Sequence, residues 1–328
     1  GLTDSGSSSY QHDSILPQIN GTLSGTSGNN GWHITPVDIR ASATDPLPGS
    51  GMGAFEYSLN SGGWEIFIAP LNLVDGVHSL NLRAADVAGN VVETSQTIQV
   101  DTVTPALDIS LNGTAGANGW YISSVEVNAT ASDDGSGLAA LETSANGGAW
   151  SEFTAPLLFN DGGHSYQFRA IDHAGNITET PLQGLNVDTV PPAIDLPASW
   201  TLGQTVIFKL QDDGSGLAGL RVVFEDEDER YPKVTWDDGL SGNKFKDEIA
   251  WNGRFKGGIQ APPGGEYYAW LKVTDNAGNE SMRAGQVIVE TVVPPPAVLP
   301  ITPAVVTEEP VPVEPEGVVP QSPLPPAN

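Results

Sequence analysis

Hydrophobic and polar residues alternate along several short stretches of this chain. In SVEVNATA, residues 124–131, the apolar positions recur at every second residue from Val125, and SYQFRAI at 165–171 shows the same period. A period of two is typical of half-buried antiparallel strands, because successive side chains point to opposite faces of a sheet. Clusters of Gly, Asn and Asp interrupt these stretches at short intervals. We therefore expect many short strands joined by tight turns, and hardly any helix.

Long segments of the sequence repeat. GNNGWHITPVDIRASATD at 28–45 is answered by GANGWYISSVEVNATASD at 116–133. Trp120 follows Trp32 by 88 residues, and later parts of the two segments keep nearly the same offset. So constant an offset indicates a duplicated domain.

Several short strands within fewer than about 100 residues predict a two-sheet sandwich of the immunoglobulin type. The fold class expected is thus all-β, with tandem immunoglobulin-like antiparallel β-sandwiches and a disordered Pro-rich tail. The predicted boundaries are 1–16 for a flexible leader, 17–105 and 106–192 for two Ig-like domains, 193–293 for a divergent third Ig-like domain, and 294–328 for a Pro-rich linker or stalk.

Charge and composition narrow the function classes. The chain has 13 basic and 40 acidic residues, a net charge of −27, and no cysteine. Such acidity disfavours nucleic acid and anionic membranes as partners, and the lack of cysteine excludes disulfides and thiolate metal sites. We expect no membrane span, since no run of eighteen apolar residues occurs. Because the chain opens with glycine, we interpret it as a processed or excised piece of an exported protein.

The motifs YSLNSGGW, DGVH and AADVAGN in the first unit, with their counterparts in the second, resemble the Ig-like repeats of bacterial surface and secreted proteins. The third unit, through WNGR and PPGGEYYAWLKVTDNAGN, resembles the Ig-like domain of flagellar hook-capping proteins. The resemblance implies a sandwich fold and an exported, extracellular setting. It leaves function open, because such modules serve as spacers, adhesin stalks and receptor ectodomains.

Asp-x-Ala-Gly-Asn occurs three times, ending at Asn90, Asn176 and Asn279. In a seven-strand sandwich this turn, the DDGSGL loop and the incoming linker aspartate meet at one end of the domain. We therefore expect a polar cluster at each domain end. The candidate residues are Asp45, Asp86, Asn90, Asp101, Asp133, Asp134, Asp172, Asn176, Asp188, Asp212, Asp213, Asp275 and Asn279.

Two interpretations of these residues stay open. Asp and Asn cap turns by accepting backbone amide hydrogen bonds, and Gly supplies a positive φ, which alone explains the motif. Alternatively, the clustered carboxylates bind Ca²⁺, which prefers oxygen ligands. The resemblance to large bacterial adhesins with similar repeats implies calcium at such junctions. Calcium is the single cofactor that we consider.

No nucleophile elbow, P-loop or dinucleotide fingerprint occurs, so we expect no enzyme activity. In the third unit Trp236, Trp251 and Tyr231 are possible contacts for an unknown glycan or protein partner. The function predicted is a non-catalytic extracellular spacer or adhesion stalk, stiffened by calcium. The alternative is a carbohydrate- or protein-binding accessory region of a larger secreted enzyme or membrane signalling receptor.

Overall fold

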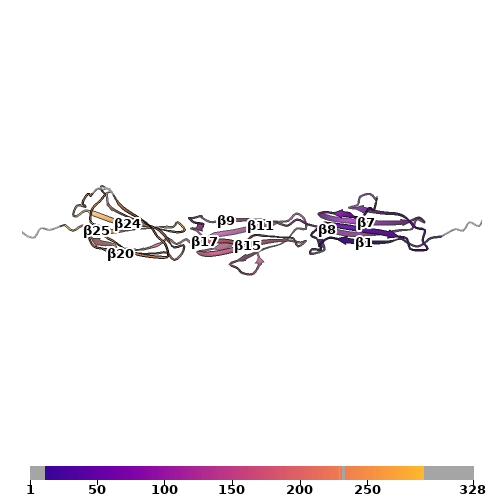
Figure 1. Ribbon diagram of the computed structural model, residues 1–328, viewed down its shortest axis with the longest axis horizontal. Coiled ribbons are helices and arrows are strands. Elements are labelled where there is room, and N and C mark those ends of the chain that lie inside the picture. Colours follow the sequence, from indigo (N-terminus) through magenta and orange to yellow (C-terminus); the bar gives the residue numbers. More distant parts are fainter. Residues whose placement is uncertain (1–11, 229, 231–232, 257, 292–328) are drawn as a thin grey trace, which may run out of the picture.

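The computed structural model describes residues 12–228, 230, 233–256 and 258–291. They form three β-sandwiches that follow one another along one long axis (Figure 1). Strands and loops make up this part of the chain, and none of it is a helix with the length and apolar character that a bilayer crossing requires. The all-β prediction is confirmed. The predicted Pro-rich stalk, 294–328, lies outside the described residues.

Domain 1 packs a three-stranded sheet, β1-β3-β6, against a five-stranded sheet, β2-β8-β7-β4-β5. Its strands pair antiparallel except for β2, which runs parallel to β8. The strands are β1 (Gln18–Ser24), β2 (Trp32–His33), β3 (Val37–Thr44), β4 (Met52–Leu59), β5 (Glu65–Ile66), β6 (Leu71–Leu73), β7 (Gly76–Asp86) and β8 (Val91–Val100).

Domain 2 repeats this topology, with sheets β9-β11-β14 and β10-β17-β15-β12-β13. The position of β8 is taken by two shorter strands, β16 and β17, which both pair with β15. The strands are β9 (Ala106–Asn112), β10 (Trp120–Tyr121), β11 (Val125–Ser132), β12 (Leu138–Ala145), β13 (Ser151–Glu152), β14 (Leu157–Phe159), β15 (Gly162–Asp172), β16 (Ile177–Glu179) and β17 (Gln183–Val187).

Domain 3 keeps the three-plus-five arrangement, with sheets β18-β20-β23 and β19-β25-β24-β21-β22. It differs in longer edge strands β22 and β23, in a shorter β18, and in a long connection between β23 and β24. The strands are β18 (Ala193–Asp195), β19 (Ser199–Thr201), β20 (Val206–Gln211), β21 (Leu217–Asp226), β22 (Val234–Gly239), β23 (Lys244–Ile249), β24 (Glu266–Asp275) and β25 (Glu280–Ile288).

The alternating sequence explains why these segments form strands. Along β11 and β24 buried side chains alternate with less buried ones, so each strand gives one face to the core and one to solvent. The buried residues gather in three separate hydrophobic clusters, one inside each sandwich. Each domain therefore has its own core, and the two junctions depend on loops and linkers.

Candidate metal sites at the domain ends

The linker aspartate is fixed at the start of each domain. Asp101 directly follows β8 and is 1% exposed. Its carboxylate accepts hydrogen bonds from the backbone amides of Ser136, at 2.6 Å, and of Val103, at 3.2 Å. Asp188 makes the same two bonds at the start of domain 3, to the amides of Ser215 and Val190. These bonds tie the linker to the domain that it enters.

The Asp-x-Ala-Gly-Asn turn closes on its own aspartate. Asp172 Oδ1 accepts the amides of Gly175, at 2.6 Å, and Asn176, at 2.8 Å, and the Asn176 side-chain amide donates to Asp172 Oδ2 at 2.8 Å. Gly175 has a φ of 99°, a conformation that disfavours side chains. The Asn176 side chain also donates to the carbonyl of Asp101, at 3.0 Å. The turn thus holds both itself and the linker.

A third carboxylate comes from the loop that joins the two sheets, which is β3–β4 in domain 1, β11–β12 in domain 2 and β20–β21 in domain 3. In domain 2, Asp133 Oδ2 accepts the amides of Gly137, at 2.7 Å, and Gly135, at 3.1 Å. In domain 3, Asp212 accepts the equivalent amides on separate oxygens, that of Gly214 on Oδ1 at 3.1 Å and that of Gly216 on Oδ2 at 2.6 Å. In each of three groups of aspartates, one carboxylate oxygen from every member lies within 4.8 Å of those from the other two. The groups are Asp13, Asp45 and Asp86; Asp101, Asp133 and Asp172; and Asp188, Asp212 and Asp275.

These groups concentrate negative charge. Among the described residues, no Lys or Arg forms an ion pair with any of the nine carboxylates. Burial, and then the nearby charges of Asp188 and Asp275, raise the pKa of Asp212. At domain 1, backbone hydrogen bonds from Ile15 and then Ser50 lower the pKa of Asp13. Asp45 Oδ1 is buried with no hydrogen-bond partner among the described residues.

The donor set fits Ca²⁺. Three carboxylates from three separate loops offer hard oxygen ligands within one small volume, and a bound divalent cation would offset most of the repulsion between them. Domain 1 carries an orphaned oxygen, Asp45 Oδ1, that a cation would satisfy. Turn capping and ion binding are compatible, since an aspartate oxygen that accepts an amide keeps lone pairs for a metal.

The structure separates the predicted residues into three kinds. Eight of the predicted aspartates lie in the three groups, as expected for residues at converging loops. The three predicted asparagines, Asn90, Asn176 and Asn279, instead direct their side-chain amides at the turn aspartate and the linker. Asp134 and Asp213 lie outside the groups; both are exposed, and Asp213 accepts a hydrogen bond from Gln211 at 2.6 Å.

Sequence reasoning missed Asp13, which it assigned to the flexible leader. Asp13 is the linker aspartate of domain 1, and Asn90 donates to its carbonyl at 3.2 Å and to that of Ile15 at 3.4 Å. Residues 12–16 are therefore attached to domain 1. The signal was present: HDSILP at 12–17 matches VDTVTP at 100–105, with the aspartate second and the proline last.

The same junctions contain direct contacts between neighbouring domains. The Asn29 amide of domain 1 donates to the Ala174 carbonyl of domain 2 at 2.7 Å, and the Asn30 side chain donates to the His173 carbonyl at 3.0 Å. At the next junction the Ala117 backbone amide donates to the Ala277 carbonyl at 2.6 Å, and the Asn118 side chain donates to the Asn276 carbonyl at 2.9 Å. The repeated GNNGW and GANGW segments thus serve as docking loops.

Glycine makes this docking possible. A Cβ atom on Gly28 would lie 2.2 Å from the Ala174 carbonyl oxygen, and one on Gly116 would lie 2.2 Å from that of Ala277. Both distances are far below van der Waals contact. Any side chain at these two positions would therefore separate the domains.

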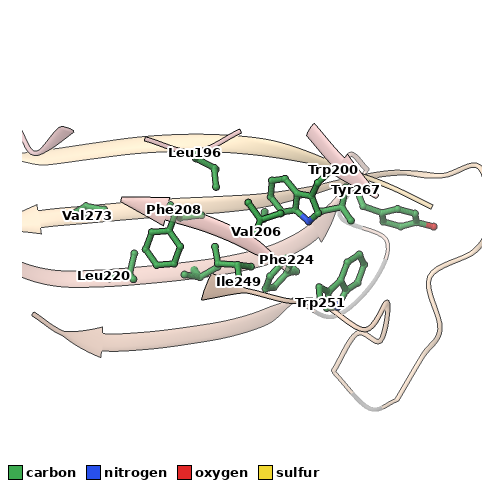
Figure 2. Close-up of a cluster of buried hydrophobic side chains, with 14 of the residues drawn as sticks. Leu196, Trp200, Val206, Phe208, Leu220, Phe224, Ile249, Trp251, Tyr267 and Val273 are labelled. Atoms are coloured by element: carbon green, nitrogen blue, oxygen red, sulfur yellow. The ribbon is translucent and has the colours of Figure 1, made fainter. Parts of the chain in front are cut away.

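The possible ligand contacts in domain 3 differ in position. Trp236 on β22 is 38% exposed, whereas Trp251 is 4% exposed and its ring lies 5.4 Å from that of Phe224 in the core (Figure 2). The Trp251 indole N–H donates to the Arg254 carbonyl at 3.0 Å. Trp251 is thus a core residue, and its assignment as a surface contact is wrong, because burial satisfies both its ring and its donor. Tyr231 lies outside the described residues.

A groove of domain 3 that the sequence did not indicate lies beside Trp270. It encloses about 330 Å³ and is lined on β21, β24 and β25 by Arg221, Lys272 and Met282 as well as Trp270. Half-buried Trp270 lies beside side chains of both charges, because Glu225 also lines the groove and Lys272 is paired with Glu280 at 2.8 Å. The residues are spread over three strands, which explains why no local motif revealed them.

No protein-family model matches the sequence, and no curated protein matches it either. Among solved structures, a tetra-tandem repeat in the extending region of a large adhesion protein is 15% identical, with a TM-score of 0.36; the match covers 82% of this chain and 74% of that one. Dimeric latent PorU from Porphyromonas gingivalis is 12% identical, with a TM-score of 0.23, and the match covers 85% of this chain and 34% of that one.

A Bacteroides ovatus protein, SGBP-B of a mixed-linkage glucan utilization locus, was solved in complex with a mixed-linkage heptasaccharide. It is 10% identical, with a TM-score of 0.18, and the match covers 84% of this chain and 70% of that one. With TM-scores this low, these likenesses carry no weight for function, which is inferred from the geometry of the chain itself.

Proposed function

We propose that this chain is a non-catalytic spacer or adhesion stalk of a bacterial surface or secreted protein, stiffened by calcium at its domain ends. One observation carries the proposal: the same three-carboxylate group recurs at the start of every domain, where the linker enters. Two of the three groups therefore lie at domain junctions. An ion bound there would join the linker to two loops of the following domain.

The linkers support a rod rather than flexibly joined domains. At the first junction the Thr102 amide donates to Asp75 of domain 1 at 2.8 Å, while Asp101, one residue earlier, accepts the Ser136 amide of domain 2. At the second junction Thr189 and Asp161 repeat the first of these contacts, at 2.8 Å. Each short linker is thus fastened to the domains on both sides, and its proline restricts it further.

Thermal unfolding in EDTA, calcium or magnesium tests the proposal. Calcium at about 100 times its dissociation constant would stabilise a domain by about 2.7 kcal/mol per site. For a domain of this size, that raises the midpoint by roughly 10 °C or more. We expect this rise with calcium and a smaller one with magnesium.

Two neighbouring aspartates provide a matched pair of variants. Asp133→Asn removes one carboxylate from the junction group, whereas Asp134→Asn removes the same charge from an exposed residue outside it. We expect the first variant to lose most of the calcium response of domain 2 and the second to retain it. Equal responses in both variants would show that the aspartates cap turns and bind no ion.

Glycan binding by domain 3 is a second candidate, favoured by the groove beside Trp270. An aromatic ring flanked by polar donors is suited to the apolar face and hydroxyls of a sugar. A glycan array probed with the chain, Trp270→Ala and Trp236→Ala tests this. Binding that is lost in Trp270→Ala supports the accessory-module function, and an array without signal for the unmodified chain rejects it.

A further inference from the structure

Each domain presents the same Asp-x-Ala-Gly-Asn turn at its linker end, but only two of the three turns are covered. Ala174 and Ala277 are 0% exposed, whereas the equivalent Ala88 of domain 1 is exposed. The covering group at Ala174 is the docking loop of domain 1, and at Ala277 it is that of domain 2. Among the described residues, nothing donates a hydrogen bond to the Ala88 carbonyl.

The three turns are built alike, so this difference does not come from the turn itself. The Ala88 amide donates to the Ser50 hydroxyl at 2.9 Å, and Ala174 and Ala277 donate to the hydroxyls of Ser136 and Ser215 at the same distance. Each turn is further closed by its aspartate and its asparagine. The Ala88 carbonyl is therefore held in the orientation that its two equivalents use to accept a docking loop.

The space around the glycine of each turn differs in the same way. A Cβ atom on Gly175 would lie 2.8 Å from the Asn29 side chain, and one on Gly278 would lie 3.4 Å from Ala117. A Cβ on Gly89, the equivalent glycine of domain 1, would meet nothing within 4 Å. The space that a docking loop fills at the other two turns is open here.

We propose that the linker end of domain 1, centred on the Ala88 carbonyl, is a docking surface for a further β-sandwich module that presents a Gly-x-Asn-Gly-Trp loop. The amide of the second loop residue would donate to the Ala88 carbonyl, and the asparagine side chain would donate to that of Val87. Both bonds copy those at the two occupied turns.

No domain of this chain can be the occupant while both internal junctions are formed. The docking loops of domains 1 and 2 are both engaged at the internal junctions; they lie in the connections Gly25–Gly31 and Gly113–Gly119. Domain 3 has no counterpart, because only Leu196–Ala198 connect β18 to β19. A second copy of the chain would thus have no free donor loop, which leaves another module of the domain 1 type. Joined in sequence, such a module would dock at high effective concentration.

An internal duplication of residues 13–100 tests the proposal in the full chain. It places a second copy of domain 1 so that its Val100 precedes Asp13 of the original copy, just as Val100 precedes Asp101. The chain has no cysteine, so spin labels can be placed at Ser42→Cys in both copies. The reference is the unduplicated chain labelled at Ser42→Cys and Thr130→Cys, across the known junction.

We expect electron–electron distance distributions of equal width for the duplicated and reference pairs, in EDTA as well as in calcium. Gly28→Val in the upstream copy should broaden the distribution. Gly63→Val in that copy should not, because a Cβ at Gly63 meets nothing within 4 Å. The amplitude of the thermal unfolding transition, compared with that of the unduplicated chain, establishes that the added copy is folded. A broad distribution from a folded copy, or no effect of Gly28→Val, would overturn the proposal without affecting the calcium assignment.

Discussion

Asp212 shows what the concentration of carboxylates does at a single residue. It is 3% exposed, and burial together with Asp188 and Asp275 raises its pKa above the ordinary 3.8. The charged form of Asp212 is therefore disfavoured in the folded protein whenever no cation balances it. A bound divalent ion would reverse this effect and convert an unfavourable group into a stabilising one.

This raised pKa predicts the direction of a pH effect. Folded Asp212 keeps its proton to a higher pH than unfolded Asp212, so the folded state binds more protons between 3.8 and the raised folded value. In EDTA, the contribution of Asp212 to the free energy of unfolding should then fall as the pH rises through this window. Denaturant unfolding of the chain and of Asp212→Asn at several pH values measures it. A difference between them that is constant with pH would contradict the expectation.

The two tryptophans of domain 3 give a second prediction for single residues. Trp251 packs against Phe224, Phe255 and Tyr267, so Trp251→Ala should destabilise domain 3 by about 3–5 kcal/mol. Trp236→Ala should have a much smaller effect, because the side chain is partly exposed on an edge strand. Denaturant unfolding compares the two variants. Similar losses would mean that the assignment of Trp251 to the core is incorrect.

At this scale the sequence predicted most of the carboxylate groups but misjudged two residues. Eight aspartates could be placed because the repeats align the loops that carry them. Asp13 was missed because its neighbours are rich in Ser and Gly, a composition that suggested a flexible leader. Trp251 was misjudged because a loop that folds back into its own core has no periodic pattern to show burial.

At the scale of elements, the docking loops set the relation between neighbouring domains. Their Asn-Gly pairs have positive φ, at 53° and 83° in Asn30 and Gly31, and at 52° and 79° in Asn118 and Gly119. These residue types adopt such angles with little strain, so the docked shape of each loop costs little conformational energy. The sequence showed that this loop repeats, but a contact between residues 143 apart, as for Asn30 and His173, carries no local signal.

Gly116→Val tests the role of the loop as an element. The added side chain would meet the Ala277 carbonyl, so we expect domains 2 and 3 to lose their fixed orientation while each domain stays folded. Gly184→Val is the control, since a Cβ there meets nothing within 4 Å and β17 tolerates valine. Small-angle scattering should show a less extended particle for Gly116→Val alone. Identical scattering curves for the two variants would show that the docking loop does not fix the orientation of the domains.

At the scale of the whole molecule, two kinds of contact act in series along the rod (Figure 1). The docking loops fix how one domain sits on the next, and the carboxylate groups fix the linker that passes between them. The chain's net charge of −27 would keep such rods apart from one another in solution. Overall extension could be anticipated from the number of repeats and the short linkers, whereas the fixed orientation depends on contacts that only the structure reveals.

Calcium titration by calorimetry tests the central claim most directly. Three ions should bind saturably to the full chain, one for each carboxylate group. Asp133→Asn should reduce this to two, and Asp134→Asn should leave it unchanged. Absence of saturable heat, or identical titrations for the two variants, would contradict the claim that these domain ends are calcium sites.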